Sequence, residues 1–135
     1  MDLQKNVTSI MTSQIESVSP DQLLVDLKHI YEKSAFHHHI PVVKDDHVVG
    51  MVSLIDFMRA ISYATLDDNE KVYQTIKVSD IMSSHPVTLE KTASVKDAVE
   101  LLSKGEFSSV VITDQGKLTG IVTNTDLVRL LLHSN

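Results

Sequence analysis

The sequence contains one pattern twice, and this duplication limits the possible folds more than any other feature. Residues 50–56, Gly-Met-Val-Ser-Leu-Ile-Asp, return 70 residues later as Gly-Ile-Val-Thr-Asn-Thr-Asp. Upstream, Val-Thr-Ser-Ile-Met at residues 7–11 returns 71 residues later as Val-Ser-Asp-Ile-Met. Phe36 and Phe107 keep the spacing of 71, so the one-residue difference between the two spacings falls in the histidine run after Phe36. Because an internal repeat marks two copies of one structural unit, we expect two matching halves with matching polar sites.

Hydrophobic periodicity predicts the order β-α-β-β-α in each half, and therefore an α/β (α+β) fold with a small sheet per half. We place repeat 1 at residues 1–64, a polar linker at 65–77 and repeat 2 at 78–135. In repeat 1 we expect a helical turn at 7–11, strands at 17–18, 40–43 and 48–52, a helix from an N-cap at Ser19 to about residue 33, and a helix through residue 61. In repeat 2 we expect strands at 87–89, 110–112 and 118–122 and helices at 94–104 and 126–132.

Composition excludes several classes of function. The chain of 135 residues has a net charge of −6 with histidine neutral, and it lacks the clustered Lys and Arg that a nucleic-acid partner requires. Cysteine is absent, which removes disulfides, thiolate catalysis and cysteine zinc sites. No segment has the length and apolarity of a signal peptide or a membrane span. We therefore expect a cytoplasmic protein without membrane insertion.

Each repeated segment that begins with glycine, residues 50–56 and 120–126, ends in a pattern that has two chemical interpretations. Ser53 and Asp56, at an expected strand-to-helix junction, fit the N-cap and N3 positions of a capping box. Ser94 and Asp97 have the same spacing without a preceding glycine strand, so spacing alone favours the capping role. The same geometry also suits a nucleotide, because a helix N-terminus attracts phosphate and a carboxylate accepts hydrogen bonds from both hydroxyls of a ribose.

Several segments, in the same order in both halves, resemble the CBS-domain family. Gly-hydrophobic-x-Ser/Thr-x-x-Asp at a strand-to-helix junction is similar to the nucleotide motif of that family. Ile-Met-Thr at 10–12 and Ile-Met-Ser at 81–83 resemble its opening segment, and Ile-Pro-Val-Val at 40–43 before an acidic turn resembles its central strand. The resemblance covers nearly the whole chain and implies one tandem CBS pair, or Bateman module, with pseudo-two-fold symmetry and two clefts between its sheets.

The resemblance also implies a class of ligand. The family typically binds adenosine compounds, namely AMP, ADP, ATP, S-adenosylmethionine or, less often, a dinucleotide, and no catalytic cofactor is expected. By motif match, Asp56 and Asp126 would hold ribose hydroxyls, and Ser53 and Thr123 would lie beside the ribose or first phosphate. Backbone of the strand entrances would line the adenine. The expected nucleotide-binding residues are Thr12, Ser17, Val18, His38, His39, Ile40, Pro41, Ser53, Asp56, Val87, Thr88, Ser109, Val110, Val111, Thr123 and Asp126.

The two halves differ before their central strands, where phosphate-binding family members often carry a basic pair. The first half has His37, His38 and His39, and the second has Ser108 and Ser109. Because imidazoles titrate near neutral pH, we expect the first site to favour a charged nucleotide and to bind it more tightly at mildly acidic pH. The second site would prefer a less charged adenosine ligand or stay empty. Histidines at an ordinary polar strand entrance are the alternative.

The histidine run also invites a metal interpretation. His37 and His39 would share one face of a strand, but the sequence fixes no cysteine or carboxylate beside these two ligands. We therefore expect no metal site.

Three functions from different classes remain open. The leading hypothesis is a sensor in which an adenosine ligand changes the arrangement of a homodimer that acts on an unknown partner protein. The apolar closing helix, residues 126–132, fits either an internal core or a dimer surface, and the resemblance favours the dimer. The second hypothesis is a ligand-free CBS dimerisation scaffold. The third is a histidine-metal hydrolase, but no recognisable catalytic motif supports an enzyme.

Overall fold

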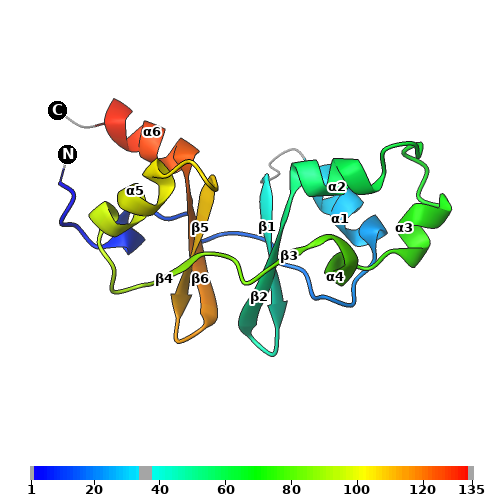
Figure 1. The fold of residues 1–135 in the computed structure, drawn as a ribbon, viewed down its shortest axis with the longest axis horizontal. Coiled ribbons are helices and arrows are strands. Elements are labelled where there is room, and N and C mark those ends of the chain that lie inside the picture. The colour runs from blue at the N-terminus through cyan, green and yellow to red at the C-terminus, as the bar shows by residue number, and fades with distance from the viewer. Residues whose placement is uncertain (1, 34–37, 134–135) are drawn as a thin grey trace. The chain divides into compact units, whose positions relative to one another are not determined.

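The structure is a computed structural model that describes residues 2–33 and 38–133 (Figure 1). The chain divides into two compact units. Unit 1 combines Met1–Ile15 with Pro86–Asn135, and unit 2 is Glu16–His85. The first residues of repeat 1 therefore belong to the unit that is built mainly from repeat 2.

Unit 2 has the β-α-β-β-α order predicted for the first half. β1 and β2 form an antiparallel hairpin, and β3 pairs with β2. Figure 1 shows α1, α2 and α3 on the same side of this hairpin. The elements are a parallel bridge between Val18 and Val42, α1 (Leu24–Tyr31), β1 (His39–Lys44), β2 (His47–Ser53), α2 (Leu54–Ala60), α3 (Lys71–Thr75), α4 (Val78–Ile81) and β3 (Ser83–Ser84).

Unit 1 repeats this order. β4 runs parallel to β5, and β5 and β6 form an antiparallel hairpin. The N-terminal segment joins the unit through backbone hydrogen bonds from Val7 N to Ala93 O, 2.8 Å, and from Val95 N to Lys5 O, 2.8 Å. The elements are the short 3-10 helix η1 (Val7–Ser9), β4 (Thr88–Glu90), α5 (Val95–Ser103), β5 (Ser109–Asp114), β6 (Lys117–Thr123) and α6 (Asn124–Leu132).

The structure corrects the predicted start of the first long helix. The N-cap is Leu23, not Ser19, and the helix begins at Leu24. Ser19 instead starts a separate turn, in which its own N–H donates to Gln22 Oε1 at 2.8 Å. A bridge from Leu23 to Lys77 holds Leu23 extended, so the helix cannot begin earlier.

Two further segments differ from the expected elements. The strand expected at residues 17–18 is a single bridge at Val18. The polar segment at 65–77 contains α3, and the Tyr73 side chain within it is fully buried. The Tyr73 hydroxyl donates to Thr65 O at 2.7 Å. Burial of the Tyr73 ring thus holds the polar segment at 65–77 against the rest of unit 2.

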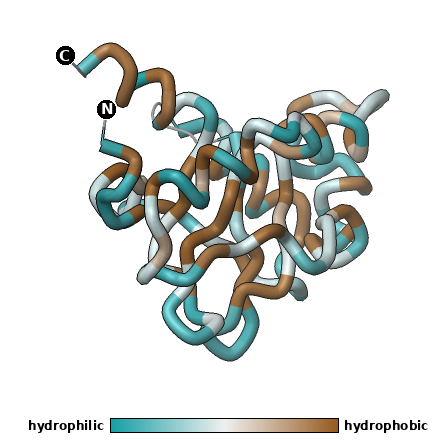
Figure 2. The backbone as a smooth tube through the Cα atoms, turned by 60° about the vertical axis from the view of Figure 1, so that its left-hand side comes forward, coloured by the Kyte–Doolittle hydropathy of each residue, from teal (hydrophilic) through white to brown (hydrophobic). Residues whose placement is uncertain are grey.

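Each unit has its own hydrophobic cluster. The strand and helix residues of unit 2 gather around Leu24, Leu27 and Val52, and those of unit 1 around Ala98 and Val110. Hydrophobic stretches of backbone follow the strands, while hydrophilic stretches mark the hairpin turns (Figure 2). Burial of aliphatic side chains is the main force that stabilises such a small unit. It contributes roughly 25 cal/mol of free energy for each Å² of apolar surface removed from water.

The opening segments of the two repeats are exchanged between the units. Met11, from the start of repeat 1, packs against Gly120 of β6, and Met82, from the start of repeat 2, packs against Gly50 of β2. A Cβ atom at Gly120 would lie 2.5 Å from Met11 Sδ and 2.9 Å from the carbonyl oxygen of Thr12. Close packing within the protein therefore favours glycine at both positions of the repeated motif, most strongly at Gly120.

We predict that Gly120→Ala lowers the melting temperature more than Gly50→Ala. A flexible methionine can move aside in both variants, but only at Gly120 does the new methyl group also come within 3.0 Å of a backbone oxygen. Overpacking of this kind costs about 1–3 kcal/mol. Thermal unfolding followed by circular dichroism tests the order, and a Gly120→Ala variant as stable as wild type would contradict it.

Candidate functional site

In unit 2, Ser53 and Asp56 form the capping box that the sequence predicts. β2 ends at Ser53 and α2 begins at Leu54. Asp56 N donates to Ser53 Oγ at 3.0 Å, and Ser53 N donates to Asp56 Oδ2 at 3.0 Å. Both side chains are half-buried. The carboxylate is thus fixed at the first turn of a helix, where the helix dipole stabilises negative charge.

The histidines before β1 lie beside this box. His39 is paired with Ser53 across the β1–β2 ladder, and His38 O accepts a hydrogen bond from Leu54 N at 2.7 Å. Burial lowers the pKa of the half-buried His39 imidazole from its ordinary value of 6.5; the charge of His38 acts in the same direction, and Asp56 opposes it. The His39 ring is therefore held neutral near pH 7. His37 lies outside the described residues.

In unit 1, the equivalent box contains one more hydroxyl. Thr123 N donates to Asp126 Oδ2 at 2.8 Å, and Asp126 N donates to Thr123 Oγ1 at 3.3 Å. In addition, Thr12 Oγ1 donates to Asp126 Oδ1 at 3.2 Å. The Asp126 side chain is 9% exposed. The structure thus brings together three of the predicted site residues from widely separated parts of the sequence.

The remaining predicted residues lie at the strand entrances of the two units. In unit 2, Val18 N donates to Pro41 O at 3.1 Å, which places residues 17–18 beside residues 40–41. In unit 1, Val111 N donates to Val87 O at 3.0 Å, and Thr88 is paired with Val111. Ser17, Thr88 and His38 are exposed. Ile40, Pro41, Val110 and Val111 are buried, so only their backbone groups are suited to contact a ligand.

A third capping box shows that this geometry alone does not define a binding site. In α5, Ser94 N donates to Asp97 Oδ2 at 2.9 Å and Asp97 N donates to Ser94 Oγ at 3.2 Å. Hydrogen bonding to the Asp97 carboxylate, first from the Ser94 backbone and then from the Ser94 side chain, holds the pKa of Asp97 below its ordinary value of 3.8. The boxes at Asp56 and Asp126 differ because each follows a glycine-containing strand packed against a repeated opening segment.

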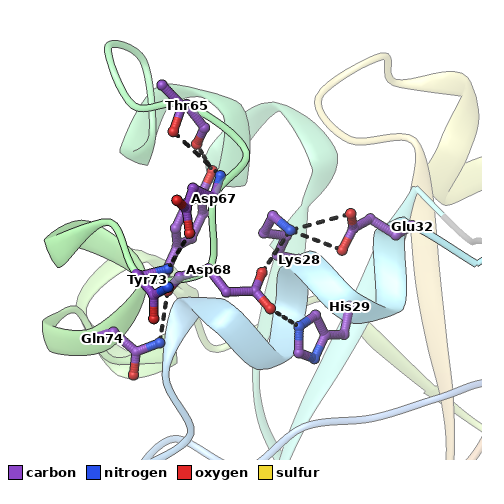
Figure 3. Close-up of polar contacts among 9 residues, drawn as sticks. Lys28, His29, Glu32, Thr65, Asp67, Asp68, Tyr73 and Gln74 are labelled. Atoms are coloured by element: carbon purple, nitrogen blue, oxygen red, sulfur yellow. Dashed lines mark hydrogen bonds and ion pairs between the residues drawn. The ribbon is translucent and has the colours of Figure 1, made fainter.

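Sequence reasoning missed a charged cluster between α1 and the segment that joins α2 to α3 (Figure 3). Lys28, only 5% exposed, lies 2.7 Å from Asp68 Oδ1 and 3.1 Å from Glu32 Oε1. Its ammonium group also lies 5.8 Å from the centre of the Tyr73 ring. His29 Nε2 lies 2.8 Å from Asp68 Oδ2. The spacing of Lys28 and Glu32 was the only signal in the sequence for this cluster, and Asp68 is 40 residues away from Lys28.

His29, Glu32 and Asp68 have ligand atoms within 4.8 Å of one another, as a metal site would require. The Lys28 ammonium already neutralises both carboxylates at hydrogen-bond distance. Its hydrogen bond holds the pKa of Asp68 below the ordinary value of 3.8, and His29 adds to this effect. Because a divalent cation would have to displace a buried positive charge, the cluster is best explained as an ionic contact that holds the segment of Asp68 on α1.

Two exposed apolar side chains occupy equivalent positions in the two repeats. Met58 on α2 is 57% exposed and Val128 on α6, 70 residues later, is 56% exposed. α6 also exposes Leu131 and Leu132. The sequence left open whether the closing helix is core or surface, and the structure shows that part of it is exposed. Within residues 2–33 and 38–133, no helix is long and apolar enough to span a membrane.

Curated proteins include relatives whose sequences match most of this chain. A CBS domain-containing protein of Dictyostelium discoideum is 31% identical over 134 residues, which cover 93% of this chain and 90% of that protein. Other relatives are longer: the match spans 28% of a Methanocaldococcus jannaschii protein at 32% identity, and 8% of the A-adding tRNA nucleotidyltransferase of Aquifex aeolicus at 41% identity. The chain thus spans less than a third of these two proteins.

Solved structures have the same fold. CBSX2 in complex with AMP is 27% identical, with a TM-score of 0.78 over 95% of this chain and 97% of that chain. The CBS domain of a bacterial CNNM/CorC family Mg2+ transporter in complex with ATP is 20% identical, with a TM-score of 0.81 over 98% and 91% of the two chains. The family model described as CBS domain matches residues 7–63 and again residues 78–133. This chain therefore belongs to the CBS-domain family and contains two CBS repeats.

Proposed function

We propose that this chain is an adenosine-nucleotide-binding regulatory module that acts on a partner protein. The observation that carries the proposal is the recurrence, in both units, of an aspartate at N3 of a capping box directly after a glycine-containing strand. The AMP complex of CBSX2, 27% identical over nearly the same length, supports an adenosine ligand. AMP, ADP, ATP and S-adenosylmethionine share the adenosine group that such a site would recognise.

The proposed roles follow from the chemistry of each group. Asp56 and Asp126 are acceptors for the ribose hydroxyls, since an ionised carboxylate accepts several hydrogen bonds. Ser53 and Thr123 are placed at helix N-termini, which attract the first phosphate. The buried strand entrances at residues 40–41 and 110–111 offer backbone to the adenine edge. None of these roles requires a bond to form or break, so we propose binding and not catalysis.

Regulation requires that the ligand bind one arrangement of the protein better than another. We propose that the arrangement in question is that of a homodimer, formed through the apolar faces that carry Met58 and Val128. The regulated partner would then recognise the nucleotide-dependent form. A scaffold of the same fold without a ligand is the alternative, and the binding experiment separates the two.

We predict that AMP binds the full chain and that Asp56→Asn and Asp126→Asn each abolish or weaken binding at one site by roughly tenfold or more, because each removes a charged acceptor. Asp97→Asn is the matched control, since Asp97 has the same capping geometry outside the proposed sites. Isothermal titration calorimetry measures the affinity of each variant. The Asp97→Asn variant should bind AMP as wild type does.

Two results would contradict the nucleotide-binding proposal. One is the absence of any heat or thermal shift with AMP, ADP, ATP and S-adenosylmethionine, although the protein is folded and dimeric; this result would favour the scaffold. The other is an equal effect of all three aspartate variants, which would mean that the aspartates act only through helix capping.

The lowered pKa of His39 predicts a specific pH dependence. In the free protein, the unfolded chain takes up a proton at its ordinary pKa of 6.5 while the folded chain resists it, so stability falls as the pH is lowered through 6.5. A phosphate near His39 would favour the imidazolium, so AMP should bind more tightly at pH 6 than at pH 7.5. His39→Gln should remove both effects. Adenosine, which has no phosphate, is the control ligand and should bind equally at both pH values.

The comparison that decides the role of His39 is the one between AMP and adenosine. Equal affinity of AMP at both pH values, or the same pH dependence in His39→Gln as in wild type, would contradict the phosphate role. Melting temperatures over the same pH range give the independent measurement of stability without ligand.

We predict that the protein is a dimer and that Met58→Asp and Val128→Asp dissociate it, because each places a charge on an exposed apolar position. Light scattering should give twice the chain mass of 15.0 kDa for wild type and the chain mass for the variants. Tyr63→Asp, at an exposed site outside the repeated positions, should stay dimeric. A dimer that survives both of the first two substitutions would exclude these faces as the interface.

A further inference from the structure

The two proposed ribose-binding carboxylates are not equivalent. Asp126 uses both carboxylate oxygens: Oδ2 accepts from Thr123 and Oδ1 accepts from Thr12 Oγ1 at 3.2 Å. In the described part of the chain, Asp56 has a hydrogen-bond partner only on Oδ2, from Ser53 N at 3.0 Å. Asp126 is also buried, whereas Asp56 is half-buried. Among residues 2–33 and 38–133, Asp56 has a donor on one carboxylate oxygen, whereas Asp126 has a donor on each.

The difference arises from equivalent positions in the two opening segments. Thr12 forms a two-bond bridge with Ile121, through Thr12 N to Ile121 O at 2.8 Å and Ile121 N to Thr12 O at 2.9 Å. At the equivalent place in unit 2, Ser83 pairs with Met51. Thr12 is half-buried and directed to Asp126, while Ser83 is exposed. The backbone arrangement is thus shared, and within the described residues the two opening segments differ in whether their hydroxyl is bonded to the aspartate.

We propose, building on the nucleotide-binding function above, that the Thr12 hydroxyl is an internal competitor for the ligand at Asp126, and not the direct ligand contact that the family resemblance implies. It occupies the carboxylate oxygen that a ribose hydroxyl would otherwise use. The site at Asp56 therefore binds the adenosine ligand first and more tightly. The site at Asp126 binds it only after Thr12 has given up its hydrogen bond.

This competition connects the second site to the N-terminal segment. Thr12 lies only four residues before Glu16, where the chain enters unit 2, and Met11 beside it packs on Gly120. A ligand that displaces the Thr12 hydroxyl changes the contacts of this segment. Occupancy of the second site is thus the step that alters the N-terminal segment, and the first site can fill without doing so.

The test is titration of the full chain with AMP in Thr12→Val, which removes the hydroxyl and keeps the size of the side chain. Loss of one competing hydrogen bond should tighten binding at the Asp126 site by roughly threefold to tenfold. Thr12→Ser keeps a hydroxyl that can still donate to Asp126, so it should not tighten binding at the Asp126 site as Thr12→Val does. Asp56→Asn and Asp126→Asn backgrounds assign each affinity to its site, and melting curves establish that each variant is folded.

The outcomes separate this inference from the function on which it rests. Tighter binding at the Asp126 site in Thr12→Val, with the Asp56 site unchanged, supports the competition. Weaker or unchanged binding in Thr12→Val overturns it, and so does a wild-type protein in which the Asp126 site fills first; each of these results leaves nucleotide binding itself intact. Failure of AMP to bind either site overturns the proposed function and this inference together.

Discussion

The packing of a methionine against a glycine, which occurs once in each unit, is the contact on which the rest of the structure depends. It attaches the opening segment of one repeat to the central hairpin that the other repeat supplies. The contact leaves little room for a Cβ atom, least at Gly120, where the carbonyl oxygen of Thr12 is also close. Because Met11 precedes Thr12, the contact in unit 1 also places the Thr12 hydroxyl beside Asp126. Fold and site therefore share one steric requirement.

The capping boxes explain how the carboxylates of the proposed sites are kept in position without a ligand. Each aspartate satisfies free backbone N–H groups at a helix start, which is favourable in its own right. A ligand at either proposed site would meet a carboxylate that is already oriented, so little conformational entropy would be lost on binding. The α5 box, with the same geometry and no glycine strand before it, separates the structural part of this role from the proposed binding role.

The sequence predicted most of the element order because the repeat, the alternating apolar strands and the serine–aspartate pairs are local signals. It identified Ser53 and Asp56, and Thr123 and Asp126, as pairs at strand-to-helix junctions, and the structure confirms that geometry. The exchange of opening segments could not be predicted, since no local pattern says on which hairpin Met11 will pack. The predicted start of α1 was wrong because the bridge between Leu23 and the distant Lys77 determines where the helix begins. The bond between Thr12 and Asp126 spans 114 residues and has no counterpart in the sequence pattern.

The most direct test of the central claim is a crystal structure of the full chain grown with AMP, in which the position of the ribose can be measured. The predicted result is a ribose whose 2′ and 3′ hydroxyls lie within hydrogen-bond distance of the Asp56 carboxylate, which still caps α2. A structure with AMP bound elsewhere, or with the ribose turned away from both Asp56 and Asp126, would contradict the proposed role of these aspartates.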